Sequence, residues 1–319
     1  MVKIRPTNSI LQLKFFIVFV AVVMSLGGLL GGVFYLYPLK TYDGYQKLRL
    51  YLGGVKHVKI NGLTGYYYNG CDEVLDKDCQ CVALIHGLGD KALSWKKILR
   101  GPSDGWKKPF RIYAIDLPGV EGSQVIESPS DFRIRVQAKT VINALNQECS
   151  RWTLVGNSLG GWVAIWMALD NPSQVYRLVL TGSTGFKSHF SSALKKFENL
   201  TLESLKTFHK MSYFEPRKIS DRIYMKVLNR INNSSAKTIL SAQEDDDYLD
   251  DKLSSLRTKT YLLWGDKDKV SPVRVGELFH QEIRNSTFKV VPRCGHLIHN
   301  ECPEELFSVI QKFTRSSIM

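Results

Sequence analysis

The sequence lacks the patterns through which proteins usually bind nucleic acids, although it is strongly basic. It has 43 Lys and Arg against 30 Asp and Glu in 319 residues, a formal net charge of +13. No Arg-rich helix, zinc-ligand spacing or RNA-binding aromatic signature accompanies this charge. We therefore expect no nucleic-acid partner. The charge favours a solvated basic surface, or anionic partners such as membrane lipids or an acidic substrate.

Internal repeats and low-complexity linkers are also absent from the sequence, which argues against a repeat protein. The length suits one large domain or two modest ones and allows a sizeable core. The acidic run EDDDYLDD, residues 244–251, could suggest calcium, but its spacing fits no EF-hand loop. We expect a solvated segment there, and neither a metal nor a cofactor. The oligomeric state is left open.

One long segment has no charged residue. Residues 15–37 read FFIVFVAVVMSLGGLLGGVFYLY, with Lys14 before them and Lys40 after them. The run is long enough to cross a bilayer as a helix, and aromatic residues at its end favour the membrane interface. We expect an uncleaved, single-pass membrane anchor. A cleavable signal peptide is the alternative, although no A-x-A-like cleavage site closes the segment.

Basic residues flank this segment in nearly equal numbers, so the positive-inside rule gives little guidance on orientation. They are Lys3, Arg5 and Lys14 before it and Lys40, Lys47 and Arg49 after it. A long domain that follows an anchor is translocated largely regardless of charge. We expect a short inner tail, residues 1–14, and a domain on the outer, periplasmic or extracytoplasmic, side.

The six cysteines allow two interpretations. Cys71, Cys79 and Cys81 are close enough along the chain to form a disulfide if the compartment is oxidising. Small buried or free thiols are the alternative. The sequence does not choose between them.

Short apolar runs alternate with helix-like stretches after residue 55. Two β-prone runs around Asn61-Gly62 predict a hairpin. Further runs at 82–85, 111–115, 154–155, 178–180, 261–264 and 288–291 are separated by segments of helical spacing. Buried strands that alternate with helices predict an α/β fold, a mostly parallel sheet covered on both faces.

One interval breaks this alternation. About seventy residues separate the strand ending in LVLTG from the strand YLLWG, too many for a single crossover. They read as several helices, with Thr201 and Ser204 near acidic residues as candidate helix starts. We expect a helical lid inserted over the carboxyl edge of the sheet.

The stretch WTLVGNSLGG, residues 152–161, predicts a catalytic serine. Gly156 to Gly160 fits G-x-S-x-G between a strand and a helix. That turn is too sharp for bulky neighbours, and it holds the serine exposed above the sheet. Ser158 is therefore the candidate nucleophile. The alternative is a tight turn with an idle serine.

A serine hydroxyl needs a base to take its proton and a carboxylate to orient that base. His296 follows a predicted strand near the carboxyl end, with Gly295 allowing the loop to turn. His299 is the second candidate for the base. Asp268, rather than Asp266, is placed after a strand so that it reaches over the sheet edge.

A reacting carbonyl also needs donors for its oxygen. The segment LIHGLGD follows a predicted strand, and the backbone N–H groups of Leu88 and Leu159 could point at one oxygen. We interpret His86 as a structural residue that holds this loop.

The motifs HGLG, DLPGVEGS, VGNSLGG, WGDKD and CGH occur in this order. Together they resemble the α/β-hydrolase superfamily over about residues 55–315. Within it, the closest likeness is to membrane-anchored monoacylglycerol lipases and related bacterial lipases. DLPGVEGS resembles their D-[ML]-P-G-H-E-G-[ST] loop, and CGHLIHNECP resembles their C-G-H-x-x-x-x-E-x-P. Val120 departs from this pattern, at a position that is usually a structural His.

The resemblance implies an eight-stranded, mostly parallel sheet with an inserted lid and an N-terminal membrane helix. It carries over Ser158 as nucleophile, Asp268 as acid and His296 as base, with Leu88 and Leu159 as oxyanion donors. We expect a juxtamembrane linker at 38–54, a catalytic core at 55–185 and 259–316, and a lid at 186–258.

Carboxylic-ester hydrolysis, on lipid or small esters, is the function that we favour, since an anchor suits substrates that live in membranes. G-N-S-[LM]-G-G also resembles hydrolases of carbon–carbon bonds in ring-cleavage products, but those enzymes usually carry H-G-x-G-P-G-A where HGLGDKA stands here. Another serine-dependent hydrolase is a further alternative. A non-enzymatic binding protein is the last, because a complete set of triad residues argues against it.

Overall fold

The computed structural model describes residues 32, 35–72, 79–106, 109–123, 128–189 and 200–314. The chain divides into two compact units, Met1–Gln46 and Lys47–Met319. The predicted anchor, residues 15–37, lies almost entirely outside the described residues. Within the described ranges, no helix is long and apolar enough to cross a bilayer. The predicted linker contains helix α2, Pro38–Leu52, and the predicted domain bounds stay predictions.

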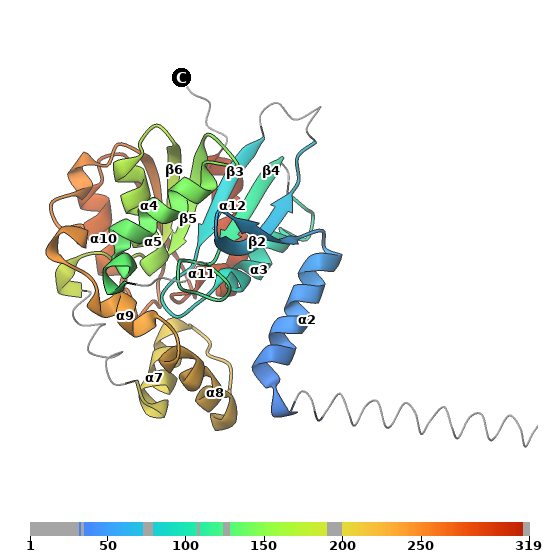
Figure 1. Ribbon diagram of the computed structural model, residues 1–319. Helices are drawn as coiled ribbons and strands as arrows, with labels where there is room; N and C mark the ends of the chain where they lie inside the picture. The colour runs from blue at the N-terminus through green and yellow to red at the C-terminus, as the bar shows by residue number, and fades with distance from the viewer. Residues whose placement is uncertain are drawn as a thin grey trace, which may run out of the picture. The chain divides into compact units, whose positions relative to one another are not determined.

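A single eight-stranded sheet forms the larger unit (Figure 1), in the order β1-β2-β4-β3-β5-β6-β7-β8. The pairs β1–β2 and β2–β4 are antiparallel and the other pairs are parallel. This confirms the predicted α/β fold with a mostly parallel, eight-stranded sheet. The strands are β1 Lys56–Ile60, β2 Leu63–Asn69, β3 Gln80–Ile85, β4 Phe110–Ile115, β5 Trp152–Asn157, β6 Val175–Thr181, β7 Lys259–Gly265 and β8 Ser286–Val291.

The predicted hairpin joins β1 and β2. Asn61 and Gly62 both have positive φ, 43° and 86°, the conformation that a two-residue hairpin turn requires. The central strands need no alternation of polar residues because helices cover both faces. All six residues of β5 are buried accordingly.

Helices cover the sheet on two sides and bury two apolar clusters. One cluster includes residues of α4, α5 and α10, and the other includes residues of α3 and α12. The bounds are α3 Lys96–Arg100, α4 Ile134–Leu145, α5 Leu159–Asp170, α10 Val273–Glu282, α11 Ile298–Glu301 and α12 Pro303–Phe313, with short 3-10 turns at Ala92–Trp95 and Pro129–Phe132.

The long interval between β6 and β7 is helical, as predicted. It contains α7 Leu202–Ser212, α8 Asp221–Asn232 and α9 Ala236–Ser241, then short 3-10 turns at Asp245–Asp247 and Leu253–Ser255. Thr201 caps α7, since its hydroxyl accepts a hydrogen bond from the Ser204 N–H. Figure 1 shows α7 and α8 side by side at one end of the sheet. We call residues 200–241 the lid helices.

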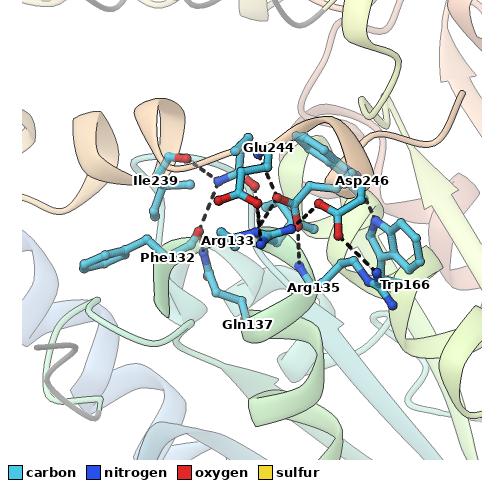
Figure 2. Close-up of polar contacts among 12 residues, drawn as sticks. Phe132, Arg133, Arg135, Gln137, Trp166, Ile239, Glu244 and Asp246 are labelled. Atoms are coloured by element: carbon cyan, nitrogen blue, oxygen red, sulfur yellow. Dashed lines mark hydrogen bonds and ion pairs between the residues drawn. The ribbon is translucent and has the colours of Figure 1, made fainter. Parts of the chain in front are cut away.

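A cluster of ion pairs holds residues 244–247, which follow the lid helices, to the core (Figure 2). The Arg133 guanidinium pairs with Asp247 at 2.8 Å, with Glu244 at 2.7 Å and with Asp246. Asp247 is fully buried, and its hydrogen bond to Arg133 holds the pKa of that guanidinium above its usual value. The acidic run is therefore more than a solvated segment, and the prediction was wrong on this point.

Asp247 also accepts hydrogen bonds from the two indole N–H groups of α5. Trp162 and Trp166, both on α5, donate to its backbone carbonyl at 2.8 and 2.6 Å. Residues 244–247 are thus held both by ion pairs between side chains and by hydrogen bonds to a backbone carbonyl.

All six cysteines are paired. The disulfides are Cys71–Cys79, Cys81–Cys149 and Cys294–Cys302. The first pair lies within the predicted group, and Cys81 instead bonds to a partner distant in sequence. The second pair closes a loop of 68 residues, and the third encloses the segment that carries His296.

Candidate active site

Ser158 occupies the turn between β5 and α5. It has φ 56° and ψ −122°, an unusual conformation for a residue with a side chain. The glycines make this turn possible. A Cβ added to Gly156 would lie 2.5 Å from the Gly160 carbonyl oxygen and from the Gly161 Cα. The geometry is the strained strand-to-helix turn that G-x-S-x-G predicts.

His296 and Asp268 meet at the same edge of the sheet. His296 Nδ1 lies 2.8 Å from Asp268 Oδ2, and both side chains are buried. The other carboxylate oxygen, Oδ1, accepts from the N–H groups of Val270 and Ser271 at 2.9 and 2.8 Å. Three donors therefore fix one carboxylate, which in turn fixes the orientation of the imidazole ring.

The hydrogen bond to Asp268 determines which nitrogen of His296 can accept a proton. A carboxylate only accepts, so Nδ1 carries the proton and Nε2 is left as the basic atom. Ser158 and His296 line one pocket. Within the described chain, no hydrogen bond joins the Ser158 hydroxyl to His296. Such bonds are often long in the absence of substrate.

Leu88 and Leu159 also line this pocket. Leu159 is the first residue of α5, so its N–H has no partner inside the helix. Neither Leu88 nor Leu159 has an N–H partner in the described part of the chain. Two unpartnered donors beside a serine are what an oxyanion site requires.

His86 holds the loop that carries Leu88. Its Nε2 lies 3.0 Å from the Leu117 N–H and its Nδ1 lies 2.8 Å from the Gly87 carbonyl oxygen. Because Leu117 can only donate, Nε2 accepts and Nδ1 carries the proton. The ring is buried and bridges two loops, as expected of a structural residue.

His299, the second candidate for the base, is not available for that role. It is buried, it stacks on Trp95 with ring centroids 4.3 Å apart, and it does not line the pocket. Burial lowers the pKa of His299 to about 4. Asp266 is likewise held elsewhere, accepting from the Cys294 N–H at 3.2 Å.

Three residues that position the His296 loop were not predicted from the sequence. Asn157 Nδ2 donates to the His296 carbonyl oxygen at 3.1 Å. Gly182 has φ 52°, and a Cβ there would lie 2.7 Å from His296 Nδ1. Glu301 accepts from the Gly295 N–H at 2.9 Å and, with its second oxygen, from the Phe214 N–H of the lid at 2.9 Å. Two of them belong to motifs that could have indicated their roles, Asn157 in GNSLGG and Glu301 in CGHLIHNECP.

The pocket has a volume of about 550 Å³ and extends from Ser158 to the lid helices. Its lid wall is largely apolar, with Leu205, Phe208, Val227 and Ile231 among its residues. His209 also lines the pocket. The volume is in the usual range for a small-molecule site.

Comparisons with known proteins show which sequences and structures this chain resembles. Over 253 residues, 73% of this chain and 86% of the relative, the chain is 28% identical to a 2-hydroxy-6-oxononadienedioate/2-hydroxy-6-oxononatrienedioate hydrolase of Paraburkholderia phymatum. A membrane phospholipase A, described as a bacterial virulence factor, matches with a TM-score of 0.71 and 24% identity, covering 95% of this chain and all of that one. An esterase from Exiguobacterium antarcticum matches with a TM-score of 0.63 and 19% identity, covering 82% and 99%.

A family model also matches most of the chain. The model is that of the alpha/beta hydrolase fold, and the match covers residues 81–302. It includes the loop of His86, the turn of Ser158 and the segments that carry Asp268 and His296. The likeness to monoacylglycerol lipases stays a prediction. The chain is a hydrolase that belongs to the alpha/beta-hydrolase fold family.

Proposed function

We propose that this hydrolase is a serine esterase that cleaves carboxylic esters of membrane lipids, of the monoacylglycerol type. Ser158 is the nucleophile, His296 the general base and Asp268 the orienting acid. The observation that carries the proposal is the pocket, which joins Ser158 and His296 to an apolar lid wall. An acyl chain is what such a wall accommodates best.

The proton of the Ser158 hydroxyl moves to His296 during the reaction. Ser158 Oγ attacks the ester carbonyl while His296 Nε2 takes its proton, and Asp268 stabilises the resulting imidazolium through Nδ1. His296 then returns this proton to the alcohol oxygen as it leaves. Water, activated in the same way, releases the acid from the acyl-enzyme.

The negative charge of the tetrahedral intermediate is met by backbone donors. The N–H groups of Leu88 and Leu159 donate hydrogen bonds to its oxyanion. The loss of one such donor commonly costs roughly 3 to 4 kcal/mol of transition-state stabilisation. The Leu159 N–H also belongs to a helix N-terminus, whose dipole favours negative charge.

Carbon–carbon bond hydrolysis of a ring-cleavage product is the second candidate, since several relatives in sequence are named 2-hydroxy-6-oxononadienedioate/2-hydroxy-6-oxononatrienedioate hydrolases. Their substrate is by name a dicarboxylate, which a pocket would recognise with cations. Of the described residues that line this pocket, only Lys269 carries a permanent positive charge. This charge balance favours a neutral, apolar ester.

Action at a membrane is supported by the surface as well as by the predicted anchor. Leu48, Tyr51 and Leu52 on α2 expose 55%, 71% and 74% of their surface, a typical feature of a segment that lies at a bilayer interface. Residues 200–241 contain eight Lys and Arg against three Asp and Glu, which favours contact with anionic headgroups. The membrane phospholipase A matches nearly the whole chain.

We propose that the catalytic unit lies on the outer side of the membrane. Three disulfides that use every cysteine suit an oxidising compartment and would be reduced in a cytosol. Mass mapping of the purified protein under non-reducing conditions tests the pairing. Free thiols at all six positions would contradict it.

A substrate comparison tests the proposed function. We expect the full-length protein to hydrolyse a short p-nitrophenyl ester in water and a long-chain monoacylglycerol in vesicles. Deletion of residues 1–38 should spare the first reaction and slow the second, because the anchor raises the effective concentration of lipid substrate. Turnover of a ring-cleavage dicarboxylate without turnover of either ester would support the second candidate instead.

A further inference from the structure

Two polar side chains of the lid wall are hydrogen-bonded to each other. His209 on α7 and Tyr224 on α8 both line the pocket, and His209 Nδ1 lies 2.7 Å from the Tyr224 hydroxyl. The other pocket-lining residues of the two helices include apolar Leu205, Phe208 and Val227 and polar Ser212. The ring of Tyr213, which follows α7 and also lines the pocket, lies 5.0 Å from the ring of His209. An acyl chain forms no hydrogen bonds, so any ligand group that this pair binds must be polar.

Both members of the pair are uncharged near neutral pH. Burial lowers the pKa of His209, so its imidazole is neutral. Burial also raises the pKa of Tyr224, so its phenol keeps its proton, and only 8% of the residue is exposed. A neutral pair does not match a carboxylate or a phosphate, which would require a cation, and the neighbouring Lys206 is already paired with Asp221 at 2.8 Å.

The pair offers the same hydrogen bonds in either tautomer. If Tyr224 donates to His209 Nδ1, then Nε2–H is a donor and the phenol oxygen still accepts. If Nδ1–H donates to Tyr224, then Nε2 accepts and the phenol O–H donates. In both cases one donor and one acceptor are left for a ligand. This is the complement of an alcohol, which both donates and accepts.

We propose that His209 and Tyr224 form a binding subsite for a hydroxyl group on the alcohol portion of the substrate, as in a glycerol ester. The inference rests on the proposed function, and it makes these two residues determinants of specificity. They distinguish hydroxylated esters from simple alkyl esters of the same acid.

Non-hydrolysable ligands test the subsite independently of catalysis. The probes are 1-O-dodecylglycerol and dodecyl methyl ether, in the same detergent, with dissociation constants measured by calorimetry on the full-length protein. Tyr224→Phe and His209→Phe should weaken binding of the glycerol ether about 5- to 10-fold, the usual value of one neutral hydrogen bond. Binding of the methyl ether should not change.

A matched control separates a binding role from a structural one. Tyr248 has the same exposure as Tyr224, 8%, and does not line the pocket, so Tyr248→Phe should leave both dissociation constants unchanged. An equal loss for both ethers would show that the pair only ties α7 to α8, and unchanged binding of both would show that it contacts no ligand. Either result overturns the proposal. Absence of ester hydrolysis by the wild type, with the ether preference intact, would contradict only the proposed function.

Discussion

Replacement of Asp268 by Asn exchanges one carboxylate oxygen for an NH2 group and should nearly abolish catalysis. The carboxylate accepts three hydrogen bonds, from His296 Nδ1 at 2.8 Å and from the N–H groups of Val270 and Ser271 at 2.9 and 2.8 Å. Asparagine has one acceptor oxygen and an NH2 group. Since the two backbone N–H groups can only donate, the amide oxygen stays with them and the NH2 group turns toward His296.

The histidine must then accept at Nδ1 and carry its proton on Nε2. Nε2 is the atom that has to take the proton of Ser158, so the ring is held in the wrong tautomer. The imidazolium also loses its carboxylate partner. We expect kcat to fall roughly 10⁴-fold, equivalent to about 5.5 kcal/mol of activation free energy, with the fold intact.

The assay is kcat for a water-soluble p-nitrophenyl ester, with circular dichroism to verify the fold. Asp266→Asn is the matched control, because Asp266 accepts from the Cys294 N–H and pairs with Lys267, away from the ring of His296. It should cost little. A kcat within tenfold of the wild type for Asp268→Asn, or a larger loss for the control, would refute the assignment.

Three further substitutions test other parts of the site and fold. Gly182→Ala places a Cβ 2.7 Å from His296 Nδ1 at a positive φ, so ester turnover should fall at least 100-fold, measured as kcat. Cys81→Ser opens the 68-residue loop closed by Cys149 and should lower the free energy of unfolding in urea by about 4 kcal/mol. His299 has a folded pKa of about 4, below its unfolded value, so the unfolded state binds more protons and stability is lost as pH falls from 6.5 to 4. His299→Phe should remove up to about 3 kcal/mol of that loss, measured by unfolding at both pH values.

The positions of the strands along the chain and the helical interval between β6 and β7 could be predicted because they depend on local patterns. Continuous apolar runs mark buried parallel strands, and Asn61-Gly62 marks the hairpin. The turn at Ser158 was also predictable, since only glycines tolerate its close backbone contacts. Such signals lie within a few residues of the feature that they predict.

The positioning residues could not be predicted in the same way, because each depends on contacts between distant segments. Gly182 matters only because His296 packs on it from more than a hundred residues away. Asp247 looked like part of a solvated acidic run until Arg133 and two indoles were found around it. The role proposed for His209 likewise depends on Tyr224, which belongs to the next helix.

The most direct test of the account is covalent labelling of the nucleophile. A fluorophosphonate probe should give one adduct on the wild-type protein, and peptide mapping by mass spectrometry should place it on Ser158. Ser158→Ala should show no adduct while its thermal unfolding midpoint stays close to that of the wild type. Full labelling of Ser158→Ala, or an adduct on a different serine of the wild type, would contradict the central claim.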